Sequence, residues 1–270
     1  MHRAASDLVR YLVCMTNRPW VLAESTWATV REQRYEVAIL PWGATEAHNF
    51  HLPYATDTVQ CDALAGDAAR IAWEAGARVV VLPSVPFGVN TGQLDVPLCL
   101  NMNPSTQAAL LADLLTVVER AGVRKLVIFN GHGGNDFRQM LRELQPKTRV
   151  FLCTLNWWQA LDTRRYFDEP GDHAGELETS VLMHVAPELV RPLAEAGDGR
   201  EMRFRIDGLR DRWVWAQREW PRITADTGVG NPKAASAAKG ATFMEALSAR
   251  IGGFLVALAA ADPAEMYETR

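Results

Sequence analysis

Four side chains of the kinds that bind divalent metal ions fall in one short stretch of the sequence, GATEAHNFHLPYATD (residues 43–57). They are Glu46, His48, His51 and Asp57. Glu46 and His48 are two positions apart, so in an extended chain their side chains point to the same side. A carboxylate beside an imidazole could form half of a ligand set for zinc, manganese or iron. The alternative is a solvated turn that ends in a helix-capping aspartate, whose charge suits the helix dipole.

A second stretch, FNGHGGND (residues 129–136), places His132 among three glycines. Glycine accepts backbone conformations that other residues avoid, and it lets a ligand approach the chain closely. The pattern therefore indicates a turn that presents His132 to a bound ion or substrate. One alternative is an incidental histidine in a glycine turn. Another is a phosphate-binding loop, although the stretch lacks the lysine and the spacing of the common phosphate loop.

A third stretch, GDHAGELETS (residues 171–180), carries Asp172, His173, Glu176 and Glu178. Acidic residues are favourable in the first turn of a helix, so a capped helix N-terminus is the alternative to a functional site. Four of the six histidines of the chain lie in the three stretches. Together the stretches supply enough nitrogen and oxygen ligands for two divalent ions, with groups left over for proton transfer.

The first two stretches directly follow predicted strands. Apolar runs predict strands at residues 36–42, 78–85, 124–130 and 148–155, and helical patterns occupy residues 57–76, 103–122, 135–144, 176–185 and 234–258. This alternation, with continuously apolar strands, is typical of a parallel sheet with helices on both faces. Ligands of such sheets bind beyond the carboxyl ends of the strands. Residues 200–217, which are charged and rich in tryptophan, give no clear prediction.

The composition is that of an ordinary globular protein. With 270 residues, 48% hydrophobic and 22% charged, we expect a single domain over residues 1–270. A net charge of −4 without a basic run argues against nucleic-acid binding. We expect no membrane span, because no run of about 18 apolar residues is uninterrupted. The apolar stretch Leu8–Met15 contains Arg10 and lacks the cleavage site of a signal peptide.

The cysteines point to the reducing interior of the cell. Cys14, Cys61, Cys99 and Cys153 include no CxxC pair, so a zinc finger or redox motif is not expected. Their apolar or helical surroundings predict reduced core thiols. We therefore expect a soluble cytoplasmic protein.

In this order, the three stretches resemble the creatininase (creatinine amidohydrolase) family, whose pattern runs approximately GSxEQHGxHLPxxTD, NGHGGN and HAGxxETS. The turn Thr227–Pro232 (TGVGNP) is similar to the family's TGVxGDP, and the resemblance covers about residues 22–258. The resemblance implies an α/β fold, a three-layer α/β/α sandwich with a mainly parallel central sheet. It also implies a hexamer and a site for two divalent ions, zinc foremost, with manganese or iron as alternatives.

The resemblance also implies roles for the residues of the first two stretches. Glu46 and His48 match the acid and the imidazole that bind one metal each, Asp57 matches the carboxylate that bridges both ions, and His132 matches the ligand of NGHGGN. Gly134 stands where creatininase itself has a glutamate ligand. The fifth ligand must therefore come from elsewhere in the chain.

The third stretch supplies the remaining groups that the resemblance implies. Glu178 is our choice for the fifth ligand, with Glu176 as the alternative. His173 matches the histidine that the family places beside the substrate for proton transfer. Asp172 or Glu176 could orient its imidazole.

The predicted activity is hydrolysis of a C–N amide bond in a small molecule, such as a cyclic amide or a formamide, by a metal-activated bridging water. One alternative is a peptidase-type maturation hydrolase of the same family. Others are a metal-dependent isomerase or lyase acting on a small polar substrate, and a non-catalytic binding module. Ala47, Asn49, Phe50 and Asn231 depart from the family pattern, which leaves the substrate open.

Overall fold

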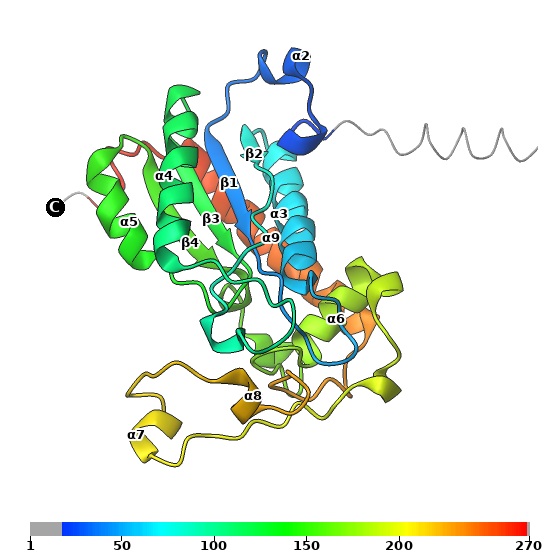
Figure 1. Ribbon diagram of the computed structural model, residues 1–270. Helices are drawn as coiled ribbons and strands as arrows, with labels where there is room; N and C mark the ends of the chain where they lie inside the picture. Colours follow the sequence, from blue (N-terminus) through cyan, green and yellow to red (C-terminus); the bar gives the residue numbers. More distant parts are fainter. Residues whose placement is uncertain (1–17, 269–270) are drawn as a thin grey trace, which may run out of the picture.

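The computed structural model describes residues 18–268, in which a four-stranded parallel sheet forms the centre (Figure 1). The stretch Leu8–Met15 and Cys14 lie outside the described residues. The strands are β1 (Val37–Trp42), β2 (Val79–Val81), β3 (Lys125–Asn130) and β4 (Phe151–Asn156). Their order across the sheet is β2-β1-β3-β4. β1 and β3 pair from Val37 with Lys125 to Trp42 with Asn130, so both central strands end at the same level.

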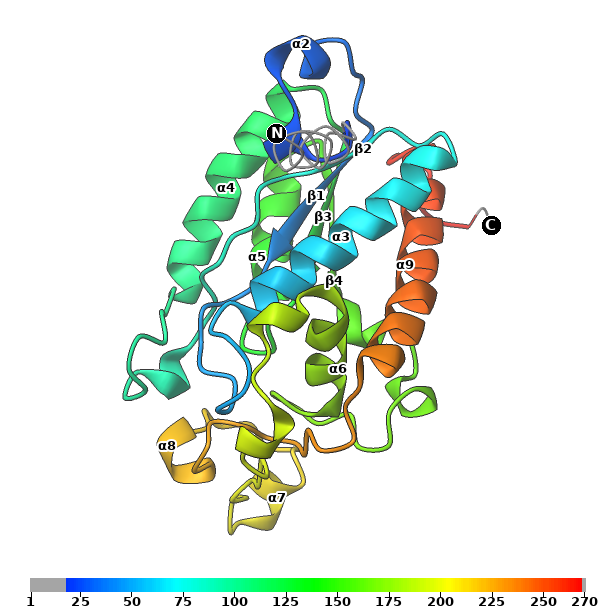
Figure 2. The ribbon, with the colours of Figure 1, turned by 90° about the vertical axis from the view of Figure 1, so that its right-hand side faces the viewer.

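Helices cover both faces of the sheet (Figure 2). The longer helices are α3 (Thr56–Glu74), α4 (Pro104–Arg120), α5 (Arg138–Leu144), α6 (Glu176–Val185) and α9 (Ala237–Ala260). Single turns of α-helix are α2 (Trp27–Val30), α7 (Asp207–Arg210) and α8 (Trp220–Ile223). Short 3₁₀ turns are η1 (Leu22–Glu24), η2 (Thr91–Gln93), η3 (Gln145–Lys147), η4 (Trp157–Gln159), η5 (Thr163–Arg165), η6 (Pro187–Leu189) and η7 (Leu193–Glu195).

Alternation along the strands divides the apolar core into two layers. In β1, Val37 and Ile39 pack with α3 and α9, whereas Ala38 and Leu40 pack with α4. Every residue of β1 and β3 is buried, which explains why these strands are apolar without polar alternation. The structure thus confirms the predicted three-layer α/β/α arrangement.

Helix α9 is the one described helix that is long and apolar enough to cross a membrane, with a mean hydropathy of 1.5 over its most apolar window. It packs along α3 and α6, and Phe243, Leu247 and Ile251 are buried in the core layer. Length and hydropathy here reflect a core helix of the sandwich.

The predicted strands agree with the structure except at β2, which is shorter than residues 78–85, and at β4, which begins at Phe151 instead of residue 148. Pro83 has no N–H to donate, and the ladder is interrupted there. The chain nevertheless continues beside β1, because Leu82 N donates to Ile39 O at 2.8 Å and Val85 N to Pro41 O at 3.0 Å. Cys61 and Cys99 are buried free thiols, and Cys153 is a half-buried one.

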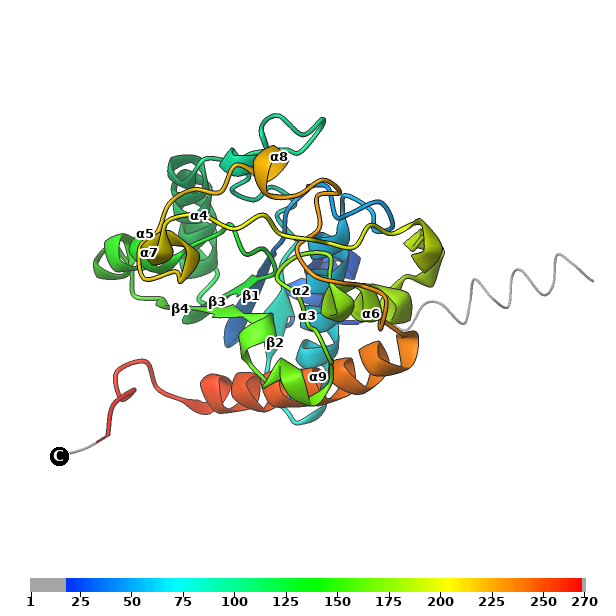
Figure 3. The same ribbon diagram turned by 90° about the horizontal axis from the view of Figure 1, so that it is seen from below.

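The connections after the two central strands diverge. α3 follows β1 and packs on one face of the sheet, whereas α5 follows β3 and contributes Met140 to the other face. The loops after β1 and β3 therefore separate at the carboxyl end, where an open parallel sheet forms its binding crevice. Seen from below, the chain segments that carry α7 and α8 lie across this end of the sheet (Figure 3).

The crossing of α9 over α6 gives a test of the packing. Gly240 lies against the carbonyl of Ser180, and an added Cβ would overlap that backbone. We expect Gly240→Ala to lower the free energy of unfolding by about 1–3 kcal/mol. Gly253→Ala, on the same helix with open space around it, should raise that energy by about 0.5–1 kcal/mol. Urea unfolding of both variants checks this packing, and equal effects would contradict it.

Candidate metal centre

The loop after β1 folds back on itself and brings its polar side chains together. Glu46 N donates to Tyr54 O at 3.0 Å, and Leu52 N donates to His48 O at 3.3 Å. Asp57 follows in the first turn of α3. Glu46, His48 and Asp57 are all buried, so the loop directs its charged groups into the protein instead of toward solvent.

His132 reaches the same point from β3. Gly131 precedes it and packs tightly on α3, because an added Cβ would overlap Cys61 Sγ. The turn is held by a network of buried amides. Asn130 Oδ1 accepts from His132 N at 3.1 Å and from Asn135 Nδ2 at 3.0 Å, and Gln107 Nε2 donates to Asn135 Oδ1 at 2.8 Å. This network fixes the backbone that carries His132.

Two overlapping groups of potential ligands result. One is Glu46, Asp57 and His132, and the other is His48, Asp57 and Glu178, with the ligand atoms of each group within 4.8 Å of one another. Asp57 Oδ2 lies 3.1 Å from His132 Nδ1, and its Oδ1 lies 3.0 Å from His48 Nε2. The two oxygens of one carboxylate thus face different histidines, as a bridging ligand requires.

Backbone carbonyls set which nitrogen of each histidine faces the centre. Nδ1 of His48 lies 3.1 Å from Glu46 O, Nε2 of His132 lies 3.1 Å from Val89 O, and Nε2 of His173 lies 2.8 Å from Ala47 O. A carbonyl can only accept, so each of these nitrogens carries the proton. In the neutral ring, the opposite nitrogen points its lone pair toward the carboxylates, which is the orientation of a metal-binding imidazole.

The histidines and carboxylates of the site shift one another's pKa values. Burial alone would lower the pKa of His48, but Asp57 and Glu46 outweigh burial and raise that pKa to about 10. Burial would raise the pKa of Asp57, yet His48 and His132 hold it well below its usual value. Asp57 therefore stays ionised and attracts positive charge to this point.

Two buried carboxylate oxygens indicate where a cation fits. Glu46 Oε1 and Asp57 Oδ2 accept no hydrogen bond from the described residues. Both lie close to His132 Nδ1, at 2.8 and 3.1 Å, and this nitrogen has no proton in the neutral ring whose Nε2 donates to Val89 O. Buried carboxylates without donors are costly. A divalent ion would satisfy all three atoms, so the donor set fits a metal.

The two candidate glutamates of α6 lie in different surroundings. Glu178 belongs to the group of His48 and Asp57, accepts from Ala174 N at 2.5 Å, and has its pKa raised to about 7, first by burial. Glu176 is buried among other partners: it accepts from Glu169 N at 2.7 Å and is paired with Lys239. Glu176 is in none of the three ligand groups of residues 18–268.

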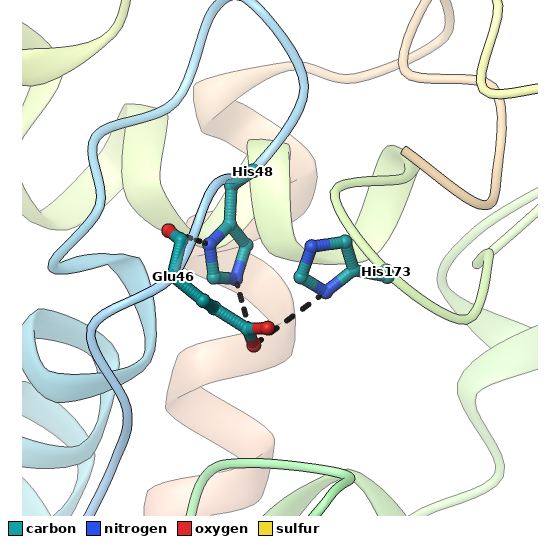
Figure 4. Close-up of side chains that lie close together, drawn as sticks. All are labelled: Glu46, His48 and His173. Carbon is teal, nitrogen blue, oxygen red and sulfur yellow. Dashed lines mark hydrogen bonds and ion pairs between the residues drawn. The ribbon is translucent and has the colours of Figure 1, made fainter. Parts of the chain in front are cut away.

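His173 stands beside both groups and forms a third with Glu46 and His48 (Figure 4). Its Nδ1 lies 3.8 Å from Glu46 Oε1, and its ring centre lies 4.1 Å from that of His48. The carbonyl of Ala47 orients this ring, whereas the sequence suggested Asp172 or Glu176 for that part. Asp172 is paired with Arg218, at 2.7 Å from Nη1.

His51 belongs to the first sequence stretch but not to the ligand groups of the described chain. It shares a hydrogen bond of 2.9 Å with Thr179, and burial lowers its pKa to about 4. His51 thus ties the loop after β1 to α6 as a neutral side chain.

A cavity of about 460 Å³ opens onto the centre. Glu46, Asp57, His132, His173 and Glu178 lie in its wall. The wall also contains Asn90, Gln93, Trp215, Arg218 and Trp220, and no sequence pattern had indicated Gln93 or Arg218.

One of the unpredicted residues acts directly on a candidate ligand. Gln93 donates through Nε2 to Glu46 Oε2, and its Oε1 accepts from Cys99 Sγ at 3.2 Å. Gln93 thus holds one oxygen of Glu46, and the other oxygen is left facing His132. The sequence did not indicate this role of Gln93, because glutamine is a common residue and its contact with Glu46 spans 47 residues.

Comparison with known proteins agrees with this arrangement. The family model for creatininase, described as creatinine amidohydrolase, matches residues 23–255. A crystal structure from Bacteroides fragilis, provisionally assigned as a creatinine amidohydrolase, has 43% sequence identity and a TM-score of 0.88 and covers 94% of this chain and 100% of its own. Solved creatininases at 23–24% identity, including a zinc–zinc form and a manganese form, share the fold with TM-scores of 0.69 and 0.70.

Curated relatives fall in two groups. The mycofactocin precursor peptide peptidase of Mycobacterium ulcerans is 27% identical over 80% of each chain. The chain spans 59% of the corresponding peptidase of Mycolicibacterium smegmatis, with 28% identity. The creatinine amidohydrolase of Pseudomonas putida is 27% identical over 57% of this chain and 66% of its own. Since the family model covers most of its length, the chain belongs to the creatininase family and is a hydrolase of carbon–nitrogen bonds.

Proposed function

We propose that this protein is a dinuclear metal-dependent amidohydrolase that cleaves a C–N amide bond of a small molecule. The observation that carries the proposal is Asp57, whose two oxygens face His132 and His48 in two overlapping ligand groups. Glu46, Asp57 and His132 would hold one ion, and His48, Asp57 and Glu178 the other. We propose zinc, with manganese and iron as alternatives, because mixed carboxylate and imidazole ligands suit all three.

In the proposed reaction, the metal ligands and His173 have different roles. When bound, two divalent ions would lower the pKa of a shared water and polarise the substrate carbonyl. His173 supplies proton transfer at Nδ1, since Ala47 O holds its Nε2–H. Burial lowers the pKa of His173, so this imidazole is neutral near pH 7 and can take up a proton before passing it to the leaving nitrogen.

The cavity favours a compact substrate. Its volume of about 460 Å³ lies in the range of small-molecule sites, and its wall combines amides, charged groups and tryptophans. Cyclic amides, formamides and similar small amides fit this description. The second candidate is a peptidase-type maturation hydrolase, which the similarity to the mycofactocin precursor peptide peptidases favours. An isomerase or lyase is the third candidate, and release of an amine from a trial substrate would separate it from both hydrolases.

We further propose a single-domain cytoplasmic enzyme that assembles as a homohexamer, as the family resemblance implies. The free thiols of Cys61, Cys99 and Cys153 are consistent with a reducing compartment. We expect no role in nucleic-acid or membrane binding, given the net charge of −4 and the packing of α9 in the core.

Metal content and activity test the centre together. The purified protein should contain about two divalent ions per chain and should lose amide cleavage on chelation and regain it with metal. Asp57→Ala should lose both metal and turnover. His173→Ala should keep both ions, while turnover falls by about 10²–10⁴-fold. Full activity of His173→Ala would exclude its proton-transfer role, and protein that binds no added zinc or manganese would exclude the dinuclear site.

The two glutamates of α6 give a matched pair of variants. Glu178→Gln should lose about one ion per chain, because it removes a charged ligand of the second group. Glu176→Gln should keep both ions and lower the thermal midpoint by a few degrees, since it weakens the pairing with Lys239. Elemental analysis and thermal unfolding of both proteins distinguish the two roles. The reverse pattern would assign the fifth ligand to Glu176.

Gln93 should raise the metal affinity of the centre through its hydrogen bond to Glu46, without binding a metal itself. Gln93→Leu leaves Glu46 Oε2 without its donor, and metal affinity should fall by about 10–100-fold. Titration with zinc against a competing chelator measures this change. Gln139→Leu, at an exposed position of α5, serves as the control and should bind zinc normally. Unchanged affinity in Gln93→Leu would show that Glu46 needs no support from this amide.

A further inference from the structure

A second cavity, with a volume of about 190 Å³, adjoins the metal cavity. The two cavities share four residues in their walls, Asp172, Trp215, Ala216 and Arg218. The smaller one, termed here the arginine chamber, is lined by four arginines, Arg203, Arg210, Arg212 and Arg218. Its wall holds two carboxylates, Asp172 and Glu201, so arginines outnumber acids by two.

The arginines of the chamber differ in how well they are paired. Arg218 makes the short contacts, at 2.7 Å to Asp172 and 3.3 Å to Glu201. Arg212 stands 3.8 Å from Asp172, and Arg203 stands 3.9 Å from Glu201. These two distances exceed hydrogen-bond length. The side chains of Arg203 and Arg212 are 61% and 63% exposed, so both guanidinium groups keep donors for a ligand.

The chamber is fixed relative to the metal centre by backbone contacts. Met202 N donates to Ile223 O at 2.7 Å, which ties the start of the segment to α8. Gly92 packs on the carbonyl of Arg218 so closely that an added Cβ would overlap it. Arg218 also stacks on Trp220, with its Cζ 4.7 Å from the ring centre. A ligand held in the chamber would therefore keep a defined position relative to the metals.

Trp215 connects the two cavities. Trp215 lines both cavities and is 82% exposed. So large an exposed fraction is unusual for tryptophan. An exposed indole at such a junction offers a flat apolar surface for the part of a substrate that passes from one cavity to the other.

From this arrangement we propose that the arginine chamber binds a carboxylate of the substrate while the amide lies at the metal centre. The proposal rests on the proposed function and narrows its substrate class to amides that carry a carboxylate group. Arginine suits this task because its planar fork binds a carboxylate through two parallel hydrogen bonds. Arg203 and Arg212 are then specificity-determining residues, and neutral amides are poorer substrates.

Glutarate and its neutral analogue glutaramide are suitable probes. Calorimetric titration of the zinc-treated protein should show glutarate binding that weakens with added salt. In the double variant Arg203→Gln and Arg212→Gln, glutarate affinity should fall by at least about tenfold, a change expected for losing charge-assisted hydrogen bonds. Arg222→Gln is the control, because Arg222 lies in the same segment, pairs with Glu219 and lines neither cavity.

Three outcomes would overturn the proposal: no glutarate binding at millimolar concentration, equal glutarate affinity in the double variant, or equal binding of glutaramide. Zinc content, measured on the same samples, separates this result from the proposed function. Protein without zinc that still binds glutarate through the arginines would contradict the dinuclear site but not the chamber. A protein that holds zinc and cleaves amides, but binds glutarate equally well in the double variant, would contradict the role of the chamber alone.

Discussion

Two buried carboxylates, Glu46 and Asp57, with the half-buried Glu178 beside Asp57, are the constraint on which the rest of this structure depends. Among the described residues, Glu46 and Asp57 form ion-pair contacts with histidines, and Glu178 shares a ligand group with His48 and Asp57. Neutral imidazoles leave three negative charges uncompensated, which a protein interior does not tolerate. Protonated histidines offset part of this charge, and two divalent ions would reverse its sign to a single positive charge. A positive centre suits a reaction in which negative charge develops on a carbonyl oxygen.

The surrounding structure serves to keep these charges apart from solvent and in position. Backbone carbonyls of Glu46, Val89 and Ala47 fix the three imidazoles, and Gln93 fixes Glu46. All these groups sit on the ends of the central strands or on the loops packed against them. The parallel sheet thus acts as a rigid base, and the divergence of α3 and α5 to opposite faces leaves the space above it.

Much of this could be predicted from the sequence, because the signals are local. Continuous apolar runs gave β1, β3 and β4 nearly to their ends, and the pattern of α6 gave its bounds. The three polar stretches converge in the structure. Their resemblance to the family pattern alone could not show which glutamate of α6 faces the centre. That distinction depends on Lys239, a residue 63 positions from Glu176 that draws this carboxylate away. Gln93 and the carbonyl of Ala47 escaped prediction for the same reason, since their contacts are long-range and their residue types are common.

The segment of residues 200–217 escaped prediction for a different reason. Its helical structure is the single turn α7, and α8, which follows it, is also a single turn, so no hydrophobic period marks the segment. Its arginines resemble an ordinary solvated surface in sequence. The segment is nevertheless held in place, through Gly199 N to Asp226 Oδ2 at 2.9 Å and through the packing of Arg218 on Gly92. Because it builds the rim of the cavity without supplying candidate metal ligands, its residues can change which substrates enter without altering the centre. The candidate metal ligands and the rim of the cavity therefore lie on different parts of the chain, and only the ligands are marked by compact sequence motifs.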